Sequence, residues 1–455
     1  MGTSKSQPLA RISHRMRSAD AYRVQIRTSQ NAPSSPNLRY SSSTMQKIDV
    51  AVLERDLLLR GVWQGLGTPE CHVTGGYVRD RILGRESVDL DLVLPGTLDT
   101  VSGPAHRLAA RLDTRPHILG QGEKRVWRIE TGAIKIELWP LGKLSLDADI
   151  RRRDFSCNAL VWSLPDGPLV DRIGGVPDLE DRRLRALSKT NLEDDPVRLV
   201  RAPRFLAQFS TFELDQETGD WIRDLAPRVA DAPKERIGQE LAKLLAAPCA
   251  ERGLRALVEH GLFEPSAPVA GRCNARWLVE NIDAAARLSG SAGHPVAGAI
   301  RAAGEVSRLG LLLRAWGTPR DDALSAYAWP RPTRRDATSA AFLLEHTIAA
   351  VEAGPSHRRA FIHEAGTAFP AAIGLAAAVE PDHPWNRWWR LWQSRGSELL
   401  NPEPLLSSRE IAEVLDLDPG PELGLAIDAL IDVQIRGKVK TAKTAQKWLQ
   451  RRHDR

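Results

Sequence analysis

The sequence predicts an α+β protein in which a head with a small mixed sheet is followed by an all-α remainder. From residue 45 to 190, short alternating apolar segments and helical patterns interleave with Gly and Pro punctuation, which indicates a mixed head. Beyond about residue 191, apolar residues recur at three- and four-residue spacing, so we expect only helices there. A chain of 455 residues with 42% hydrophobic content allows about two to four domains.

The predicted organisation begins with a basic leader. The chain has 63 Lys and Arg against 57 Asp and Glu, and residues 1–44 hold seven basic residues and one acidic residue, so the remainder is balanced at 56 against 56. Global charge therefore indicates nothing about partners. A mitochondrial transit peptide, a disordered arm and upstream sequence from a wrong start codon all fit this Ser- and Arg-rich leader, and we expect a dispensable extension. The further segments are a head at 45–190 and a helical neck, body and tail at 191–265, 266–400 and 401–455.

Four segments of the head predict strands: SVDLDLVL, RVWRIE, AIKIELWPL and NALVWSL. In the first, alternation places Asp89 and Asp91 on one face and directs Val88, Leu90 and Leu92 into the core. Two carboxylates held so close repel each other. A solvated strand edge is one interpretation, and the other is a divalent cation, because carboxylate oxygens are ligands that Mg²⁺ takes together with water and substrate phosphates.

A Gly-Gly pair precedes these aspartates. Gly75 and Gly76 follow an apolar run and open the helical segment YVRDRILG, whose first turn carries Arg79. Backbone amides at a helix start bind phosphate, so we expect a phosphate cradle beside the two carboxylates. The sequence has neither the G-x-x-x-x-G-K-[ST] order of a P-loop nor a G-x-G-x-x-G dinucleotide motif.

Five motifs occur in a fixed order. They are GGYVRDRILG followed by D-x-D, RRRDFSCNAL at 151–160, DRIGGVPDLEDRRLRAL at 171–187, DDPVRLVRAPRF at 194–205 and KERIGQELAKLL at 234–245. Together they resemble the class II tRNA nucleotidyltransferase and bacterial poly(A) polymerase family, a branch of the polymerase-β-like nucleotidyltransferases. The resemblance covers about residues 70–245, with a weaker similarity at 406–439 to the tail of the bacterial members.

The resemblance implies a two-metal site. Asp89 and Asp91 would hold two Mg²⁺ ions that activate an RNA 3′-hydroxyl and steady the pyrophosphate leaving group. Glu137, on the opposite face of its strand from Ile136 and Leu138, would be a third carboxylate, and an exposed strand charge is the alternative.

The RRRDF motif supplies two further candidates for nucleotide binding. The resemblance implies that Arg153 and Asp154 contact the triphosphate and the ribose hydroxyl. A solvated charged face is the alternative interpretation of such a charge run. Cys157, where the family has an aliphatic residue, is interpreted as packing.

The segment DDPVRLVRAPRF predicts how a nucleotide is selected. Asp195 and Arg198 share a helix face, and one acceptor with one donor matches the pairing edges of adenine and cytosine but not those of guanine and uracil. A helix-capping role for Asp195 is the alternative. Arg201 and Arg204 continue the face and would hold phosphates, while Pro203 should kink the helix.

Two helical segments nearer the C-terminus carry further predictions. WNRWWRLW places four tryptophans on one stripe, which we expect to be core: Trp385, Trp388, Trp389 and Trp392. The tail is basic, and its resemblance to the family favours binding to the RNA acceptor stem over a merely soluble terminus. The candidate RNA-binding residues are Lys440, Lys443, Lys447 and Arg451.

The predicted function is template-independent addition of CMP, AMP or both to the tRNA 3′ end, as in CCA addition or repair, with ATP and CTP as substrates. Addition of A alone, addition of CC alone, poly(A) synthesis and a catalytically silent RNA-binding relative are the alternatives. The G-R-R-F-R stretch of bacterial poly(A) polymerases is absent, and residues 117–129 are more similar to the tRNA enzymes. The four cysteines form no C-x-x-C pair and no apolar run approaches about 18 residues, so we expect a reduced cytoplasmic protein without a membrane span.

Overall fold

The computed structural model describes residues 48–122, 125–268, 273–290, 296–317, 321–351, 354–380 and 382–453. The predicted leader at 1–44 lies outside these residues. The chain forms two compact units: one runs up to Asp194 and takes in Thr211–Trp221, and the other comprises Asp195–Ser210 and the chain from Ile222 onward.

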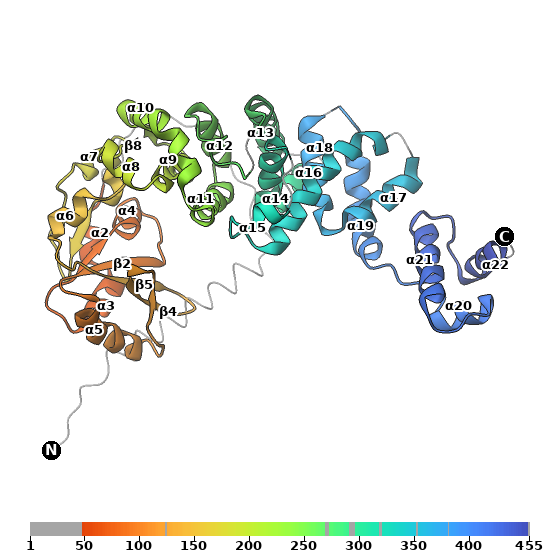
Figure 1. Ribbon diagram of the computed structural model, residues 1–455, viewed down its shortest axis with the longest axis horizontal. Coiled ribbons are helices and arrows are strands. Elements are labelled where there is room, and N and C mark those ends of the chain that lie inside the picture. The colour runs from red at the N-terminus through yellow and green to blue at the C-terminus, as the bar shows by residue number, and fades with distance from the viewer. Residues whose placement is uncertain are drawn as a thin grey trace, which may run out of the picture. The chain divides into compact units, whose positions relative to one another are not determined.

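The first unit is built on a seven-stranded mixed sheet in the order β3-β4-β5-β2-β1-β6-β7, which confirms the predicted fold class. Its strands β2, β5 and β4 are labelled in Figure 1. Only the β2–β5 pair of this sheet is parallel. All four predicted strand segments contain a strand. The strands are β1 (His72–Thr74), β2 (Asp89–Leu94), β3 (His117–Leu119), β4 (Val126–Glu130), β5 (Lys135–Pro140), β6 (Val161–Ser163) and β7 (Leu169–Val170).

The inward face of β2 follows the predicted alternation, with one correction. Leu90 and Leu92 are buried, but Val88 is 52% exposed, so its assignment to the core was wrong. Val88 precedes β2, although its carbonyl still accepts a hydrogen bond from the Lys135 amide at 2.8 Å. A period of two gives the face of a residue but does not show where the covering layer ends.

Helices pack on this sheet from several parts of the sequence. The longest, α5, contacts β4 and β5, while α4 contacts β1 and β2. The helical elements are α2 (Ala51–Glu54), α3 (Leu57–Leu66), α4 (Gly76–Ile82), α5 (Leu98–Arg111), α6 (Leu146–Arg151), the 3₁₀ turn η2 (Ser156–Asn158), α7 (Gly175–Glu180) and α8 (Lys189–Asp194).

The motif DRIGGVPDLEDRRLRAL forms a scaffold. The Asp171 carboxylate accepts hydrogen bonds from four consecutive backbone amides, 173–176, and thereby fixes the start of α7. Asp178 is buried and accepts hydrogen bonds from Arg183 and Arg185 at 2.8 Å each. A buried carboxylate needs such partners, so the spacing of this motif is explained by folding.

The expectation of helices alone after residue 191 was wrong at one place. β9 (Glu213–Leu214) pairs in parallel with β8 (Arg183–Leu184). A two-residue strand is too short to show alternation in the sequence.

The second unit is helical in its described residues. α9 contacts α11 and α12, and α14 contacts α13, α16 and α18. Its helices are α9 (Val197–Gln208), the end of α10 (Gln216–Leu225), α11 (Lys234–Ala246), α12 (Ala250–Glu259), α13 (Ala275–Gly290), α14 (Ala297–Ala315), α15 (Asp321–Ser325), α16 (Arg331–Val351), α17 (Gly354–Ala365), α18 (Phe369–Val379), α19 (Trp385–Leu400), α20 (Ser408–Leu415), α21 (Pro421–Ile435) and α22 (Ala442–His453).

The tryptophan stripe of α19 is core, as predicted. Trp385 and Trp388 are each 1% exposed and Trp389 is 8% exposed. Trp392 is partly buried, and its ring stacks on that of Phe369 with the centroids 5.1 Å apart. These rings bind α19 to its neighbours.

One segment of the described chain, Gly354–Val379, is long and apolar enough to span a membrane by length and composition, contrary to the expectation that none approaches that size. It is divided between α17, a 3₁₀ turn and α18, and 67% of its most apolar window is buried within the fold. Such burial is typical of core helices. The four cysteines are free thiols.

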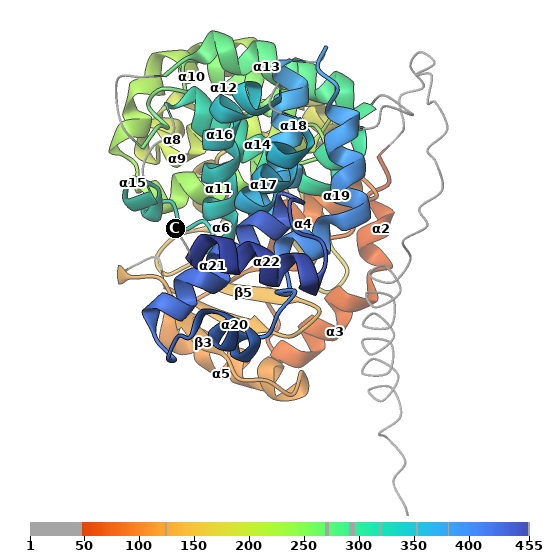
Figure 2. The same cartoon turned by 90° about the vertical axis from the view of Figure 1, so that its right-hand side faces the viewer.

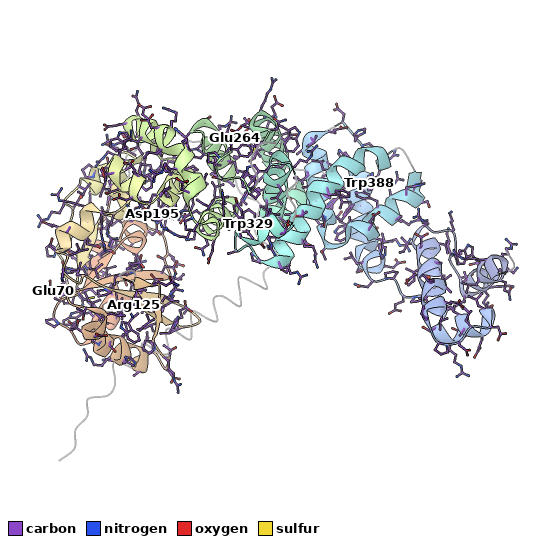
Figure 3. All side chains as sticks on the ribbon, in the orientation of Figure 1. Glu70, Arg125, Asp195, Glu264, Trp329 and Trp388 are labelled. Atoms are coloured by element: carbon purple, nitrogen blue, oxygen red, sulfur yellow. The ribbon has the colours of Figure 1, made fainter. Side chains whose placement is uncertain are left out.

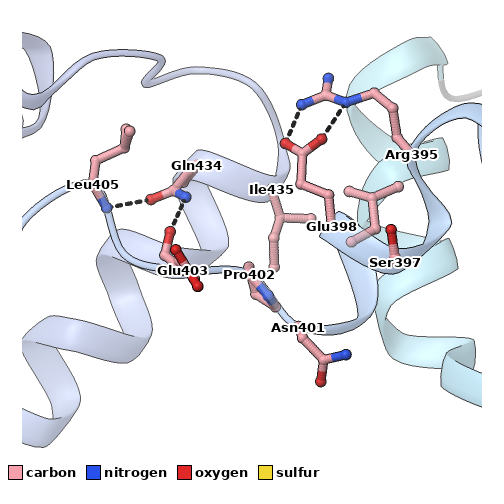
Figure 4. A pocket seen from close by; sticks show the side chains of 10 residues that line it. Arg395, Ser397, Glu398, Asn401, Pro402, Glu403, Leu405, Gln434 and Ile435 are labelled. Atoms are coloured by element: carbon pink, nitrogen blue, oxygen red, sulfur yellow. Dashed lines mark hydrogen bonds and ion pairs between the residues drawn. The ribbon is translucent and has the colours of Figure 1, made fainter.

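The last three helices, α20, α21 and α22, pack around one small core (Figure 2). A pocket between the end of α19 and the end of α21 marks the connection to this group (Figure 4). There the side chain of Gln434 accepts a hydrogen bond from the Leu405 amide at 3.1 Å and donates one to the Glu403 carbonyl at 2.6 Å. The connecting segment is therefore held to α21.

Candidate active site

The strand register gathers charged side chains on one face of the sheet. Asp91 is paired across the strands with Glu137, and Asp89 with Lys135. Arg128 of β4 is the partner of Glu137 on its other side. Paired residues lie side by side on the same face, so three carboxylates and two cations form a continuous group.

The surroundings of Asp91 disfavour the ionised form of its carboxyl group. Burial and, to a smaller extent, the charge of Glu137 together raise the pKa of its carboxyl group to about 6. Arg153 and Lys135 oppose this rise without cancelling it. The ionised carboxylate thus lacks sufficient compensating positive charge in the protein itself.

Glu137 is better compensated. Arg128 Nη2 lies 2.5 Å from its Oε1, and Lys135 Nζ lies 3.6 Å from the same oxygen. Its side chain is only 13% exposed, so the alternative of an exposed strand charge is wrong. A role as a third catalytic carboxylate stays a prediction.

Gly75 is required by the backbone and by space. It has a φ of 72°, in the left-handed region that favours glycine. A Cβ atom there would lie 3.3 Å from Asp91 Oδ2 and 3.6 Å from Arg153 Nη1. Gly76 begins α4, and a Cβ on it would lie 3.3 Å from Arg79 Nη2. The glycines therefore keep the backbone close to the charged group.

Arg153 is oriented by Asp149, a residue that the sequence reasoning missed. Its Nη2 donates to Asp149 Oδ2 at 2.7 Å, and Arg152 Nη2 donates to the other oxygen at 2.7 Å. Burial tends to raise the pKa of Asp149, but Arg153 and Arg152 outweigh burial and hold that pKa below its ordinary value. Arg153 remains 20% exposed.

Arg79 and Asp154 lie deeper than a direct ligand contact would suggest. Arg79 is 4% exposed and forms two 2.9 Å hydrogen bonds with Asp80 and one of 2.5 Å with Asn158. Asp154 is 5% exposed and accepts from the Phe155 amide at 2.8 Å and from Asn158 Nδ2 at 3.0 Å. Asn158, also missed, joins the two. Their roles in nucleotide binding stay predictions.

The carboxylates suit a divalent cation. Asp89 is 65% exposed and Asp91 is partly buried with a raised pKa, so a cation bound between them would supply the charge that the protein lacks. Within the described residues, no group of three or more His, Cys, Asp and Glu side chains is arranged to hold a metal ion. Asp89 and Asp91 would hold such an ion together with water and substrate phosphates, as is usual for Mg²⁺.

The second unit carries the predicted selection residues. Asp195, labelled in Figure 3, is bound by Arg236 of α11 through two hydrogen bonds of 2.9 and 2.7 Å. Arg198 Nε lies 3.9 Å from its Oδ2. Burial tends to raise the pKa of Asp195, but Arg236 outweighs burial and lowers it. Pro196 is the N-cap residue of α9, which has no side-chain capping bond, so the capping alternative for Asp195 is wrong.

The two arginines further along α9 share one carboxylate. Glu240 of α11 is 6% exposed, and its oxygens lie 3.2 Å from Arg201 Nε and 2.6 Å from Arg204 Nε. Arg204 also lies over the ring of Phe205, 3.9 Å from its centroid. The helix continues through Pro203 from Val197 to Gln208, so this proline does not end it.

Both residues of α11 that hold α9, Arg236 and Glu240, were missed. They stand four apart in KERIGQE, a spacing that places them on one helix face. Nothing local in the sequence identifies their partners, which are Asp195 before α9 and the two arginines on α9.

The basic residues predicted to bind RNA lie on or beside α22. Lys440, Lys443, Lys447 and Arg451 are all exposed. Ala445 and Leu449 on the other face are buried in the core of α20–α22, and Arg452 lies 5.4 Å from the ring centroid of Trp448. The helix is amphipathic, as predicted.

Two parts of the chain match known families. Residues 71–185 match the poly A polymerase head domain, and residues 211–271 match the probable RNA and SrmB-binding site of polymerase A. An A-adding tRNA nucleotidyltransferase of Deinococcus radiodurans is 30% identical over 424 residues, which cover 84% of this chain and 95% of that protein. The chain belongs to the family of tRNA nucleotidyltransferases and bacterial poly(A) polymerases.

Other family members match to different extents. A CC-adding tRNA nucleotidyltransferase of Synechocystis is 28% identical over 84% of this chain and 93% of that protein. Poly(A) polymerase I of Salmonella typhi is 30% identical over only 48% of this chain and 50% of that protein. The crystal structure of the Bacillus stearothermophilus CCA-adding enzyme in complex with CTP has a TM-score of 0.65 at 23% identity, covering 90% of this chain and 98% of that one, and shows a shared fold.

Proposed function

We propose that this nucleotidyltransferase adds CMP, AMP or both to the 3′ end of tRNA, as in CCA addition or repair. The main support for the proposal is the share of this chain that matches the tRNA enzymes. The tRNA enzymes match 84% of the chain and more than nine-tenths of their own length, whereas poly(A) polymerase I matches about half of each. The helical second unit is thus shared with enzymes named for tRNA.

In the proposed reaction, the RNA 3′-hydroxyl attacks the α-phosphate of ATP or CTP. The O3′–Pα bond forms while the bond from Pα to the β-phosphate oxygen breaks, and pyrophosphate leaves. Asp89 and Asp91 would hold the metal, which we propose to be two Mg²⁺ ions. When bound, these ions make the hydroxyl more acidic and neutralise charge on the phosphates.

The neighbouring residues position the triphosphate. Arg153, fixed by Asp149, directs a partly exposed guanidinium to the side of Asp91 and suits a phosphate contact. Gly75 and Gly76 let phosphates approach the backbone. Arg79 and Asp154 would support the backbone of this region from within the fold, because both are buried and joined through Asn158.

Asp195 and Arg198 would select the base. Asp195 accepts from the exocyclic amine of adenine or cytosine, and Arg198 donates to the neighbouring ring nitrogen. Arg236 fixes the Asp195 carboxylate with two hydrogen bonds and keeps it ionised, so an acceptor is always presented. Arg201 and Arg204 would contribute positive charge from the same helix, balanced by Glu240.

The tail would bind the acceptor stem. Lys440, Lys443, Lys447 and Arg451 lie exposed on or beside a helix that is anchored by its apolar face. Exposed cations with this anchoring suit the phosphate backbone of RNA.

Labelled-nucleotide incorporation tests the proposal. Three transcripts of one tRNA are used: one that lacks the terminal CCA, one that ends after its two cytidines, and one that is complete. Each is incubated with ATP or CTP singly and together. A CCA-adding enzyme completes the first two, a CC-adding enzyme extends only the first with CTP, and an A-adding enzyme extends only the second. Efficient extension of the complete tRNA or of an unrelated RNA with ATP would favour poly(A) synthesis, and no incorporation would favour a silent relative.

A further inference from the structure

Lys135 stands out among the charges at the candidate active site, because it contacts both a proposed metal ligand and the neighbouring carboxylate. Its Nζ lies 3.5 Å from Asp89 Oδ1 and 3.6 Å from Glu137 Oε1. The register fixes this position, since Lys135 and Asp89 are directly paired on adjacent parallel strands.

The two contacts of Lys135 differ in accessibility. The side chains of Asp89 and Lys135 are 65% and 36% exposed, and an ion pair so exposed to water is weak. Glu137 is 13% exposed and is also held by Arg128 at 2.5 Å. The Asp89 contact is therefore the one that a competing cation can displace, while Glu137 keeps its partner on β4.

We propose that Lys135 is a built-in counter-cation that competes with the divalent ion for Asp89 and so sets the ion concentration at which the site fills. The inference rests on the proposed metal site at Asp89 and Asp91. Glu137 then acts as an anchor for Lys135 and Arg128 and is not itself a metal ligand. This arrangement agrees with the absence, within the described chain, of a metal-holding group of three or more such side chains.

The test is Mn²⁺ binding to the full chain without nucleotide, measured by electron paramagnetic resonance of the free ion. Removing the charge with K135M or K135Q should tighten Mn²⁺ binding about 10-fold, because a positive charge beside a divalent ion is lost. K135R, which keeps the charge, should bind like wild type. The gain should shrink in 1 M KCl, where screening is strong.

Two controls sharpen the result. K143M removes the same charge from an exposed position after β5 and should leave Mn²⁺ affinity within about 2-fold. In a D89N background, K135M should not restore tight Mn²⁺ binding, because the ligand for which Lys135 competes is gone.

Two outcomes have distinct meanings. If D91N abolishes Mn²⁺ binding but K135M and K135Q leave it unchanged or weaker, the inference on Lys135 is overturned and the metal site stands. If wild type shows no Mn²⁺ binding that depends on Asp89 and Asp91, both are overturned.

Discussion

Two carboxylates, one in each unit, have pKa values that are shifted in opposite directions. On β2, the pKa of Asp91 is raised to about 6 by burial and by Glu137, so its ionised form is under-compensated. Just before α9, the pKa of Asp195 is lowered, because Arg236 outweighs the effect of burial. The first arrangement suits a group that completes its charge balance by binding a cation, and the second suits a group that must present a fixed acceptor.

The largest loss of activity is expected when one carboxylate of the proposed metal site is neutralised. D91N and D89N should lower nucleotide incorporation by at least about 10³-fold, because a metal ligand is lost at the reacting phosphate. Filter binding should show tRNA affinity largely unchanged. Near wild-type turnover of either variant in Mg²⁺ would contradict the two-metal assignment.

The same substitution should stabilise the ion-free protein. Because the folded-state pKa of Asp91 is about 6 and its ordinary value is 3.8, the ionised group destabilises the fold above about pH 6, and the penalty disappears as the pH falls toward 3.8. In EDTA, D91N should raise the free energy of unfolding at pH 7.5 by at most about 3 kcal/mol.

Thermal melting at two pH values measures this effect. The gain in Tm for D91N should be clear at pH 7.5 and vanish near pH 4, and Mg²⁺ should stabilise wild type more at pH 7.5 than at pH 5. A D91N protein that melts below wild type at pH 7.5 would show that Asp91 is not destabilising.

Loss of two tail charges should have an intermediate effect that is confined to RNA. K443A with K447A should weaken tRNA binding about 10-fold near physiological salt and reduce the slope of log K against log salt by about 1 to 2, because each phosphate contact releases counterions. The KM for CTP should not change. An unaltered salt dependence would show that these exposed lysines do not bind RNA.

The smallest effect is expected from the residue that holds Asp195. R236M should leave Asp195 as an acceptor but release its orientation, so discrimination against UTP and GTP should fall about 3- to 10-fold, less than for loss of Asp195 itself. The pKa of Asp195 should rise without Arg236, so discrimination should weaken further as the pH falls. R228M, in an exposed pair with Asp231, is the matched control and should keep the wild-type profile.

Local pattern was enough to predict four strands of the head, β2, β4, β5 and β6, because each shows a short period. It was also enough to predict the shared face of Asp89 and Asp91 and the tryptophan core of α19. Val88 was misplaced because a period does not show where a covering layer ends. β9 was missed because two residues make no pattern. The first error concerns the limit of an element, and the second concerns its existence.

The site was predicted only in part, since its long-range partners have no local signal. Asp149 lies four residues before Arg153 and was open to prediction as an i, i+4 pair. Arg236 is 41 residues from Asp195, and Glu240 is 39 residues from Arg201. Only the packing of α11 on α9 brings these residues together, so the sequence predicted an acceptor at position 195 but not what holds it.

The measurement that tests the account most directly is the incorporation of all four nucleotides into a tRNA that lacks its 3′ end, by wild type, D195A and D195N, beside a melting curve. We predict that wild type uses only CTP, ATP or both. Both variants should lose about 5- to 150-fold of their discrimination against UTP and GTP while overall reactivity falls less, because Arg198 can still donate to a carbonyl oxygen. An unaltered nucleotide profile with a lowered Tm would contradict the account and leave Asp195 as a structural partner of Arg236.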